Sequence, residues 1–558
     1  MVKYSKSIVA IVNVLFCLFI TNAFAQTTKN KILENGVEVP NVRASMNEFE
    51  RKEMPIPYLE NRQKLIPINV GRQLFVDDFL IEQTNLSRVN HAAVFSKQNP
   101  VLEPDKEWEY NKSGPYAAPF SDGIWYDEKE AMFKMWYLAG SPNKDKQSFH
   151  TCYAESKDGI KWDKKILGLF GDTNIVDDSD RDSNTIWLDK AETDPGKRYK
   201  MFNVEKRATD NRWQIVLKYS KDGIHWDKGV AQSGDLYDRT TAFYNPFSKK
   251  WVISMRYSAA IGRARSYLEN SSPEQAVSLA HRVRKDAKDA NISYWFGADD
   301  KEPRHPSFPN IKPEIYNHDA IAYESIMLGY YSVWQGPENK VADSLGIQKR
   351  NEVLIGYSRD GYHFSRPSHE PFMGVNEKEG AWNWGNVQSI VGVPIIKGDS
   401  LYFYASGRRL YKKMWDAYTS TGLATLRRDG FVSLDSKSKD GYITTRSVTF
   451  EGSYLFVNAN VNASLKAEIL DSNNKPIAGF TKEDCIAMKT NSTKYLISWK
   501  NKKDLAALKN KTVKIKFYVD DGSLYSFWVS KWKTGESNGY TAGGGPKLNP
   551  SGVDVPLD

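Results

Sequence analysis

Residues 156–162 read Ser-Lys-Asp-Gly-Ile-Lys-Trp, and the pattern returns at residues 220–226 as Ser-Lys-Asp-Gly-Ile-His-Trp and at residues 358–364 as Ser-Arg-Asp-Gly-Tyr-His-Phe. The first two copies start 64 residues apart and the last two 138 residues apart, which is about two repeats. An Asp-Gly pair between alternating apolar segments predicts a β-hairpin, because the central turn positions need a positive φ that glycine adopts without cost. We interpret the repeat as structural, with one copy between the last two having lost its signature.

A second repeat precedes each hairpin or replaces it. Residues 124–137, 186–202 and 242–254 each read as strand, polar turn and strand. Units of four strands that recur every 60 to 70 residues or so are typical of β-propeller blades. The sequence therefore predicts an all-β protein with a five-bladed β-propeller over residues 71–436.

The remaining segments differ from this pattern. Residues 26–70 form an N-terminal extension. Residues 437–532 contain short strands and polar turns without a helical period, which predicts a β-sandwich. Residues 533–558 are rich in Gly, Pro, Asn and Ser, which predicts a disordered tail. Inside the propeller, Ser272-Pro273-Glu274 predicts the start of a helix. Its apolar face would comprise Ala276, Ala280, Val283 and Ala287.

The chain begins with the features of a secretory signal. Lys3 and Lys6 precede an apolar run over residues 8–20, and Ala23-Phe24-Ala25 provides a small-residue cleavage site. The run is shorter than the roughly 20 residues of a membrane-spanning helix. We expect residues 1–25 to be removed after Ala25, leaving a periplasmic or secreted protein with no membrane span.

Charge and cysteine content limit the partners. The formal net charge of +9 either serves solubility or attracts an acidic partner, such as a uronic-acid or sulfated glycan. No basic block or binding motif points to nucleic acid. Cys152 and Cys485 are predicted to be lone buried thiols, although their pairing stays open. No ligand spacing or phosphate-binding loop is present, so we expect neither metal nor cofactor.

Carboxylates interrupt the predicted strands. Asp77 and Asp78 lie inside the apolar run of residues 74–81, where strand alternation sends one to each face. Asp182 is predicted to open the third blade, Asp238 with Arg239 the fourth, and Glu324 the fifth. Inner strands converge on one mouth of a propeller, so these acids would become neighbours.

Neighbouring carboxylates are what glycosidic cleavage requires. The reaction uses a protonated acid and an ionised base or nucleophile, often with a third carboxylate that tunes them. The acids at successive blade starts therefore favour hydrolysis of a glycan.

The chain also resembles a known group of enzymes. The residues that carry the resemblance are Val76-Asp77-Asp78, Arg181-Asp182, the Ser-x-Asp-Gly-x-x-Trp hairpins and the sandwich that begins near residues 443–446. Residues 71–532 are similar to the five-bladed propeller glycoside hydrolases of families 32 and 43. The resemblance implies an exo-acting hydrolase of glycan ends or side chains, with Asp77 or Asp78 as base or nucleophile and Asp182 as modulator.

The sequence departs from these families at two motifs. Asp78 is followed by Phe79, where the families show Asp-Pro, and Asp238-Arg239 stands where they show a glutamate. Glu324 is then the substitute acid.

These departures keep a rival reaction open, in which a lyase or dehydratase acts on a uronic-acid oligosaccharide. Such a reaction needs a base for the C5 proton and cations for the substrate carboxylate. The candidates are His91, His318, Tyr323, Arg239, Arg263 and Arg265.

A third hypothesis is a propeller that binds glycans without turning them over. It needs only aromatic platforms and hydrogen-bonding side chains. The candidates are Trp295, Trp382 and Trp384, with Asn386 and Gln388 as polar partners.

Overall fold

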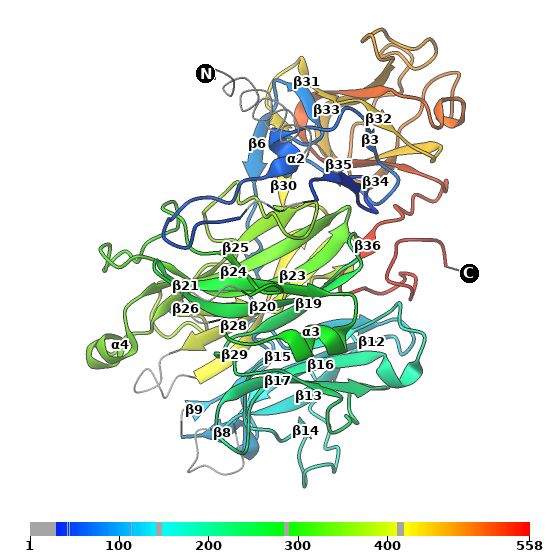
Figure 1. The fold of residues 1–558 in the computed structure, drawn as a ribbon. Helices are drawn as coiled ribbons and strands as arrows, with labels where there is room; N and C mark the ends of the chain where they lie inside the picture. Colours follow the sequence, from blue (N-terminus) through cyan, green and yellow to red (C-terminus); the bar gives the residue numbers. More distant parts are fainter. Residues whose placement is uncertain are drawn as a thin grey trace, which may run out of the picture.

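The computed structural model describes residues 30–557, apart from residues 42, 44, 113, 141–147, 284–288 and 410–417. The predicted signal peptide lies outside these residues. The predicted all-β class is confirmed, since strands dominate and helices are few and short (Figure 1). None of the helices in the described chain is both long and apolar enough to cross a membrane.

Three antiparallel sheets follow one another along the chain. Their outward strand orders are β10-β12-β13-β14, β15-β16-β17-β18 and β19-β20-β21-β22, and β11 also pairs with β12. The first sheet comprises β10 (Ala117–Ala118), β11 (Ile124–Asp127), β12 (Met132–Ala139), β13 (His150–Ser156) and β14 (Ile175–Asp177). The second comprises β15 (Arg181–Leu188), β16 (Tyr199–Lys206), β17 (Trp213–Ser220) and β18 (Ala231–Gln232). The third comprises β19 (Thr241–Asn245), β20 (Lys250–Ala259), β21 (Gly262–Asn270) and β22 (Ser293–Phe296).

A nine-stranded sheet follows and contains two antiparallel units. The first unit is β23 (Glu314–Glu324), β24 (Ile326–Gly336) and β25 (Arg350–Ser358), with β36 (Tyr540–Thr541) on its edge. The second is β26 (Asn386–Ile390), β27 (Ile395–Lys397), β28 (Ser400–Arg409) and β29 (Tyr418–Arg427), closed by β7 (Val94–Phe95). A single parallel pair, Asn351 with Asn386, joins the two units. Because β7 precedes the first sheet in sequence, its pairing with β29 brings the two ends of the series together.

The Ser-Lys/Arg-Asp-Gly repeats form identical turns after β13, β17 and β25. In each, the serine Oγ accepts the N–H of the glycine at 2.8 to 2.9 Å, and the aspartate Oδ1 accepts the next two N–H groups. Gly159, Gly223 and Gly361 have φ between 74° and 79°. Only the glycine of each pair has a positive φ, because the serine and aspartate side chains hold the rest of the turn.

These turns also join neighbouring sheets. Trp136 of the first sheet donates through Nε1 to the carbonyl of Gly223 at 2.7 Å. Tyr404 of β28 donates through its hydroxyl to the carbonyl of Gly159, also at 2.7 Å. The last unit therefore contacts the first sheet, and the series closes on itself, as a propeller requires.

A second hydrophobic core lies at one end of the molecule, around the long strands β33 (Tyr454–Leu470) and β35 (Lys514–Ser530) (Figure 1). The other strands of its sheet are β4 (Gln73–Leu74), β5 (Ile81–Thr84), β6 (Ser87–Asn90), β30 (Val432–Ser436), β31 (Gly441–Thr445) and β34 (Asn491–Leu496). Beside it, β3 (Ile66–Pro67) pairs with β32 (Val448–Thr449). Part of the N-terminal extension packs on this core, including α2 (Pro57–Glu60).

The prediction of an inner propeller strand over residues 74–81 is wrong. Residues 77–80 bend instead, because the Asp77 carboxylate accepts the N–H of Phe79 at 3.0 Å. The flanking strands β4 and β5 pair with β35 and β31. Phe75 and residues 79–81 therefore enter the second core, whereas Leu74 and Val76 pack in the first.

The predicted helix begins where expected. The N-cap Ser272 accepts the N–H of Gln275 at 3.1 Å, and α3 spans Pro273–Leu279. It ends earlier than the predicted apolar face, whose last member, Ala287, lies outside the described residues. Another short helix, α4, spans Asn339–Leu345, and 3₁₀ turns occupy Glu107–Glu109, Pro195–Lys197 and Ala506–Leu508. Short strands β1 (Lys31–Ile32), β2 (Glu38–Val39), β8 (Tyr110–Asn111) and β9 (Gly114–Pro115) complete the described elements.

The segment predicted to be a disordered tail is ordered over residues 533–557. Its strand β36 pairs with the end of β23, and the segment runs along the side of the sheets (Figure 1). Gly543 accepts the N–H of Tyr126 at 2.9 Å, and Gly544 accepts that of Ile396 at 2.8 Å. A Cβ on Gly545 would lie 1.8 Å from the carbonyl of Ile396. Its glycines therefore permit close backbone docking, which composition alone does not reveal.

Candidate functional site

A cavity of about 350 Å³ opens near the first residues of β15, β19 and β23. Asp182 is the second residue of β15, and Asp238 with Arg239 directly precedes β19. Tyr316 comes from β23 and Arg408 from β28. The structure thus brings together three of the predicted residues, Asp182, Asp238 and Arg239.

Asp182 and Arg239 form one side of this cavity. The Asp182 carboxylate accepts the backbone N–H of Arg239 at 2.9 Å and lies 3.4 Å from its Nε. The guanidinium of Arg239 stacks over the ring of Phe120, with 5.1 Å from Cζ to the ring centroid. Asp182 remains partly exposed, so its carboxylate can reach a ligand.

Asp238 is held as an anion. Its carboxylate pairs with Arg256 and, at 2.8 Å, with Arg263. Burial raises the pKa of Asp238, but the two guanidinium groups outweigh it and hold the pKa below its usual range. Asp238 is therefore not suited to donate a proton at neutral pH.

Tyr316 lines the cavity but was not predicted from the sequence. A β-bulge in β23 interrupts the pairing with β24 at this residue, since Ile315 pairs with Val333 and Asn317 with Ser332. Bulges redirect a side chain, and here the tyrosine lines the cavity.

The surroundings of the Tyr316 phenol are cationic. Lys349 Nζ donates to the phenol oxygen at 3.3 Å, and the Arg263 guanidinium lies 4.3 Å from the ring centroid. Burial raises the pKa of Tyr316. The nearby cations, first Lys349 and then Arg239, outweigh burial and bring the pKa down to about 7. A phenol with this pKa can both donate and accept a proton near neutral pH.

Two further carboxyl groups are buried nearby and were also not predicted. Asp122 forms a two-pronged ion pair with Arg181, with 3.0 Å and 2.5 Å between the paired atoms. Asp319 accepts hydrogen bonds from Ser121 at 3.0 Å and from Asn317 at 3.1 Å. Burial raises the pKa of each carboxyl to about 7.

The predicted first-blade acids lie elsewhere. Asp77 forms a buried ion pair with Arg359 at 2.7 Å, beside the second core. Asp78 is exposed and pairs with Arg88. Both belong to the bend between β4 and β5, so neither lines the cavity.

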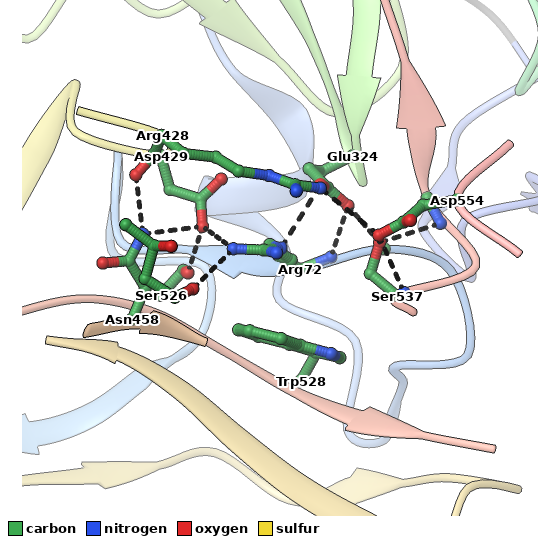
Figure 2. A network of polar contacts seen from close by, with 12 residues as sticks. Arg72, Glu324, Arg428, Asp429, Asn458, Ser526, Trp528, Ser537 and Asp554 are labelled. Atoms are coloured by element: carbon green, nitrogen blue, oxygen red, sulfur yellow. Dashed lines mark hydrogen bonds and ion pairs between the residues drawn. The ribbon is translucent and has the colours of Figure 1, made fainter. Parts of the chain in front are cut away.

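Glu324 belongs to a buried polar network between the two cores (Figure 2), which Tyr323 joins through Asp429. Glu324 lies 3.4 Å from Arg72 Nε and 3.1 Å from Arg428 Nη2. Tyr323 donates to Asp429 at 2.6 Å. Glu324 ends β23 with a φ of 53°, at the strand end away from Tyr316, so the structure does not bring it to the cavity.

The other predicted binding residues divide into two groups. His318 is fully buried among aromatic rings, including that of Trp295 at 4.9 Å, and burial lowers its pKa well below the usual value. Trp384 is half-buried and outside the cavity lining. Asn386 adjoins the cavity indirectly, because its Nδ2 donates to the carbonyl of Lys349 at 2.7 Å.

The residues predicted for a lyase or dehydratase reaction also lie in different parts of the structure. Arg263 lies beside Tyr316, and Arg265 donates to the carbonyl of Arg239 at 2.7 Å. His91 contacts Ser433 at 2.8 Å near the second core. The cations of that hypothesis therefore gather at the cavity, whereas His91 does not.

One group among the described residues has the side chains of a metal site, namely Glu53, Asp299 and His369. Arg366 already pairs with the Asp299 carboxylate at 2.5 Å. That cation already neutralises one of the three side chains, so the group does not fit a metal ion well. Cys152 and Cys485 are both buried and free.

Comparison with known proteins gives remote similarity. No family model matches the chain, and no curated protein matches it. Among solved structures, a glycosyl hydrolase from Bacteroides ovatus is 14% identical, with a TM-score of 0.38, covering 64% of this chain and 97% of that one. An N-acetylgalactosamine deacetylase from F. plautii is 10% identical, with a TM-score of 0.37 and coverage of 59% and 97%. A fructofuranosidase from Schwanniomyces occidentalis is 10% identical, with a TM-score of 0.36 and coverage of 78% and 97%. Likeness at this level assigns no activity, since one fold hosts many reactions.

Proposed function

We propose that this protein is an exported enzyme that acts on glycans, built as a five-bladed β-propeller with a β-sandwich behind it. The three separate sheets and the two units of the nine-stranded sheet would be the blades, and β7 would close the ring. The second core would be the sandwich. The signal-like residues 1–25 support export.

The cavity is the proposed active site, and hydrolysis of a glycosidic bond is the proposed reaction. One observation carries this proposal: the cavity places the partly exposed Asp182 carboxylate and the Tyr316 phenol together among cations. Hydrolysis needs a group that protonates the leaving oxygen and a base or nucleophile opposite it. Tyr316 would donate the proton, and Asp182 would activate water or attack the sugar.

Elimination is the second candidate, because the same phenol can act as a base. Ionised Tyr316 would remove the C5 proton of a uronic acid, the C4–O bond would break, and a C4–C5 double bond would form. The leaving oxygen would take a proton from the phenol or from water. Arg239 and Arg263 lie beside Tyr316 and could stabilise the negative charge that develops on the carboxylate. The modest positive charge of the chain agrees with an acidic substrate.

Mass spectrometry of products from neutral, uronic and sulfated oligosaccharides tests the proposal. Hydrolysis adds one water to the products, whereas elimination leaves an unsaturated sugar without water uptake. We expect Asp182→Asn and Tyr316→Phe each to reduce turnover at least about a hundredfold.

Two matched variants serve as controls. Asp189→Asn makes the same change just after β15, where Asp189 pairs with Lys200. Tyr330→Phe removes a buried hydroxyl in β24 that has no hydrogen-bond partner among the described residues. Normal turnover by Asp182→Asn and Tyr316→Phe would contradict the assignment, and tight binding without any product would leave a glycan-binding propeller.

A further inference from the structure

Two cations that line the cavity, Lys349 and Arg408, have unusual surroundings. Their exposed fractions are only 9% and 7%. Among the described residues, no carboxylate lies within ion-pair distance of either one. Arg408 Nε has no hydrogen-bond partner there. Lys349 Nζ donates to the phenol of Tyr316 and lies 4.8 Å from the centroid of its ring.

Most other buried cations of the described chain are paired with a carboxylate. Arg265 is an exception, because its guanidinium donates instead to Ser254 and to the carbonyl of Arg239. Arg181 pairs with Asp122, Arg359 with Asp77, and Lys134 with Asp127 and Glu130. Pairing is the rule because burying a charge without a partner lowers the stability of the fold by several kcal/mol. Lys349 and Arg408 therefore depart from the rule at a cavity, where a ligand could supply the missing charge.

The fold holds these two cations side by side. Asn386 of β26 pairs directly with Arg408 of β28, and its side chain donates to the backbone carbonyl of Lys349. Burial lowers the pKa of Lys349, and the nearby Arg408 lowers it further. The Arg408 guanidinium also lies 5.7 Å from the ring centroids of Tyr116 and Phe120. Like charges are thus fixed close together with no carboxylate of the described chain in contact, and the Tyr316 phenol beside Lys349 is negative only when it is ionised.

We propose that Lys349 and Arg408 form a subsite for an anionic substituent of the sugar, a carboxylate or a sulfate. The inference rests on the proposed function and specifies its substrate class as acidic glycans. An arginine fork donates to two oxygens of a carboxylate or of a tetrahedral oxyanion, and a lysine adds a compact positive charge. Asn386 would act as a positioning residue for both. Aromatic rings next to the subsite would pack against the sugar.

Binding measurements at fixed ionic strength test the subsite. The probes are methyl glucuronide, glucose 6-sulfate and neutral methyl glucoside. We expect Lys349→Met and Arg408→Met each to weaken binding of at least one acidic probe about tenfold, because a hydrogen bond to a charged group is lost. Binding of methyl glucoside should stay unchanged.

Two substitutions control for the loss of charge alone. Lys516→Met removes a half-buried lysine of β35 that lies 4.8 Å from the centroid of a tyrosine ring, far from the cavity lining. Arg409→Met removes the residue after Arg408 in β28. The Arg409 side chain points to the other face of this strand and stacks on Tyr418. Equal losses in all four variants, or none in the first two, would overturn the proposal.

A second measurement uses the unaltered protein and needs no turnover. The near-ultraviolet absorbance of the Tyr316 phenolate reports on charge beside Lys349. We expect sulfate or methyl glucuronide to raise the pH midpoint of this signal, and chloride or methyl glucoside to leave it in place. A midpoint that responds to none of the anions would refute the subsite. Anion binding without any product would refute only the proposed function, whereas equal turnover of acidic and neutral glycans would refute only the subsite.

Discussion

Tyr316 combines two features that seldom occur together in a buried tyrosine. It lies at a β-bulge that turns its side chain into a cavity, and it contacts Lys349 and Arg263. Burial alone disfavours a phenolate, as seen at Tyr323, whose pKa is raised well above the usual value. The difference between these two tyrosines of β23 therefore arises from their neighbours, cations in one case and carboxylates in the other.

The lowered pKa of Tyr316 predicts a titration near pH 7. One phenolate should appear in near-ultraviolet difference spectra with a midpoint of about 7, and Tyr316→Phe should abolish it. The folded-state pKa is below the value near 10 of an unfolded chain, so this group adds stability that is complete above about pH 10 and lost as the pH falls through about 7. A Tyr330→Phe control should keep the signal, and a spectrum without any phenolate below about pH 9 would contradict the prediction.

The same titration separates the two reactions through the pH profile of activity. If Tyr316 donates a proton in hydrolysis, the rate falls as the pH rises through about 7. If it accepts a proton in elimination, the rate rises over the same range. Rates on the best oligosaccharide between pH 5 and pH 9 or so decide between them, and a flat profile would remove Tyr316 from both roles.

At the scale of elements, the repeated turns connect strands within a sheet and sheets with one another. The glycine of each turn needs a positive φ and also approaches a neighbouring sheet. A Cβ on Gly223 would lie 2.4 Å from Trp136 Cζ2, and one on Gly361 would lie 2.1 Å from Asn245 Nδ2. The glycine is therefore needed twice, once for the conformation of the turn and once for the close packing between sheets.

Gly223→Ala should lower stability more than the positive φ alone explains. We expect about 2–4 kcal/mol, from the strained φ together with the displacement of Trp136. Gly171→Ala is the matched control, because Gly171 has a φ of +66° and a Cβ added there would meet no atom within 4 Å. It should cost about 1 kcal/mol. Thermal unfolding followed by near-ultraviolet circular dichroism measures both, and equal losses would mean that the contact with Trp136 is unimportant.

At the scale of the whole molecule, one buried network ties together the two cores and the C-terminal segment (Figure 2). Arg72 contacts both Glu324 and Asp429 and stacks on Trp528 at 4.1 Å from the ring centroid. Ser537 donates to Glu324 at 2.6 Å. Because the partners come from distant parts of the chain, the network fixes how these parts pack together.

Breaking this network should destabilise the fold strongly. Glu324→Gln removes the charge that faces two guanidinium groups and should cost about 3 kcal/mol. Asp78→Asn removes an exposed carboxylate paired with Arg88 and should cost less than about 1 kcal/mol. Thermal unfolding compares the two variants. Equal stability of both would contradict a central role of the network.

Three residues of the candidate site could be predicted because their signals are local. The Ser-Lys/Arg-Asp-Gly turns are held by hydrogen bonds between residues at most three apart, and they mark the strand ends. That spacing predicts Asp182, Asp238 and Arg239 at the start of inner strands, and the structure brings them to one cavity.

The rest depended on pairing between distant segments. Residues 74–81 have the composition of a strand. The strands at their two ends, β4 and β5, nevertheless pair with β35 and β31, more than 300 residues away in sequence. Glu324 has the sequence position of a substitute acid, but Arg72 and Arg428 bury it between the cores. The polar, glycine-rich tail has the composition of a disordered segment, yet its backbone docks on the sheets.

The sequence by itself determined the all-β class, the repeated turns and the strand starts that carry Asp182, Asp238 and Arg239, because these follow from neighbouring residues. Only the tertiary structure decided that Tyr316 enters the cavity and that Lys349 and Arg408 meet there. A bulge depends on the register between two strands, and the two cations are joined by Asn386 across different strands. Register and strand neighbours are set by long-range packing, which no local pattern encodes.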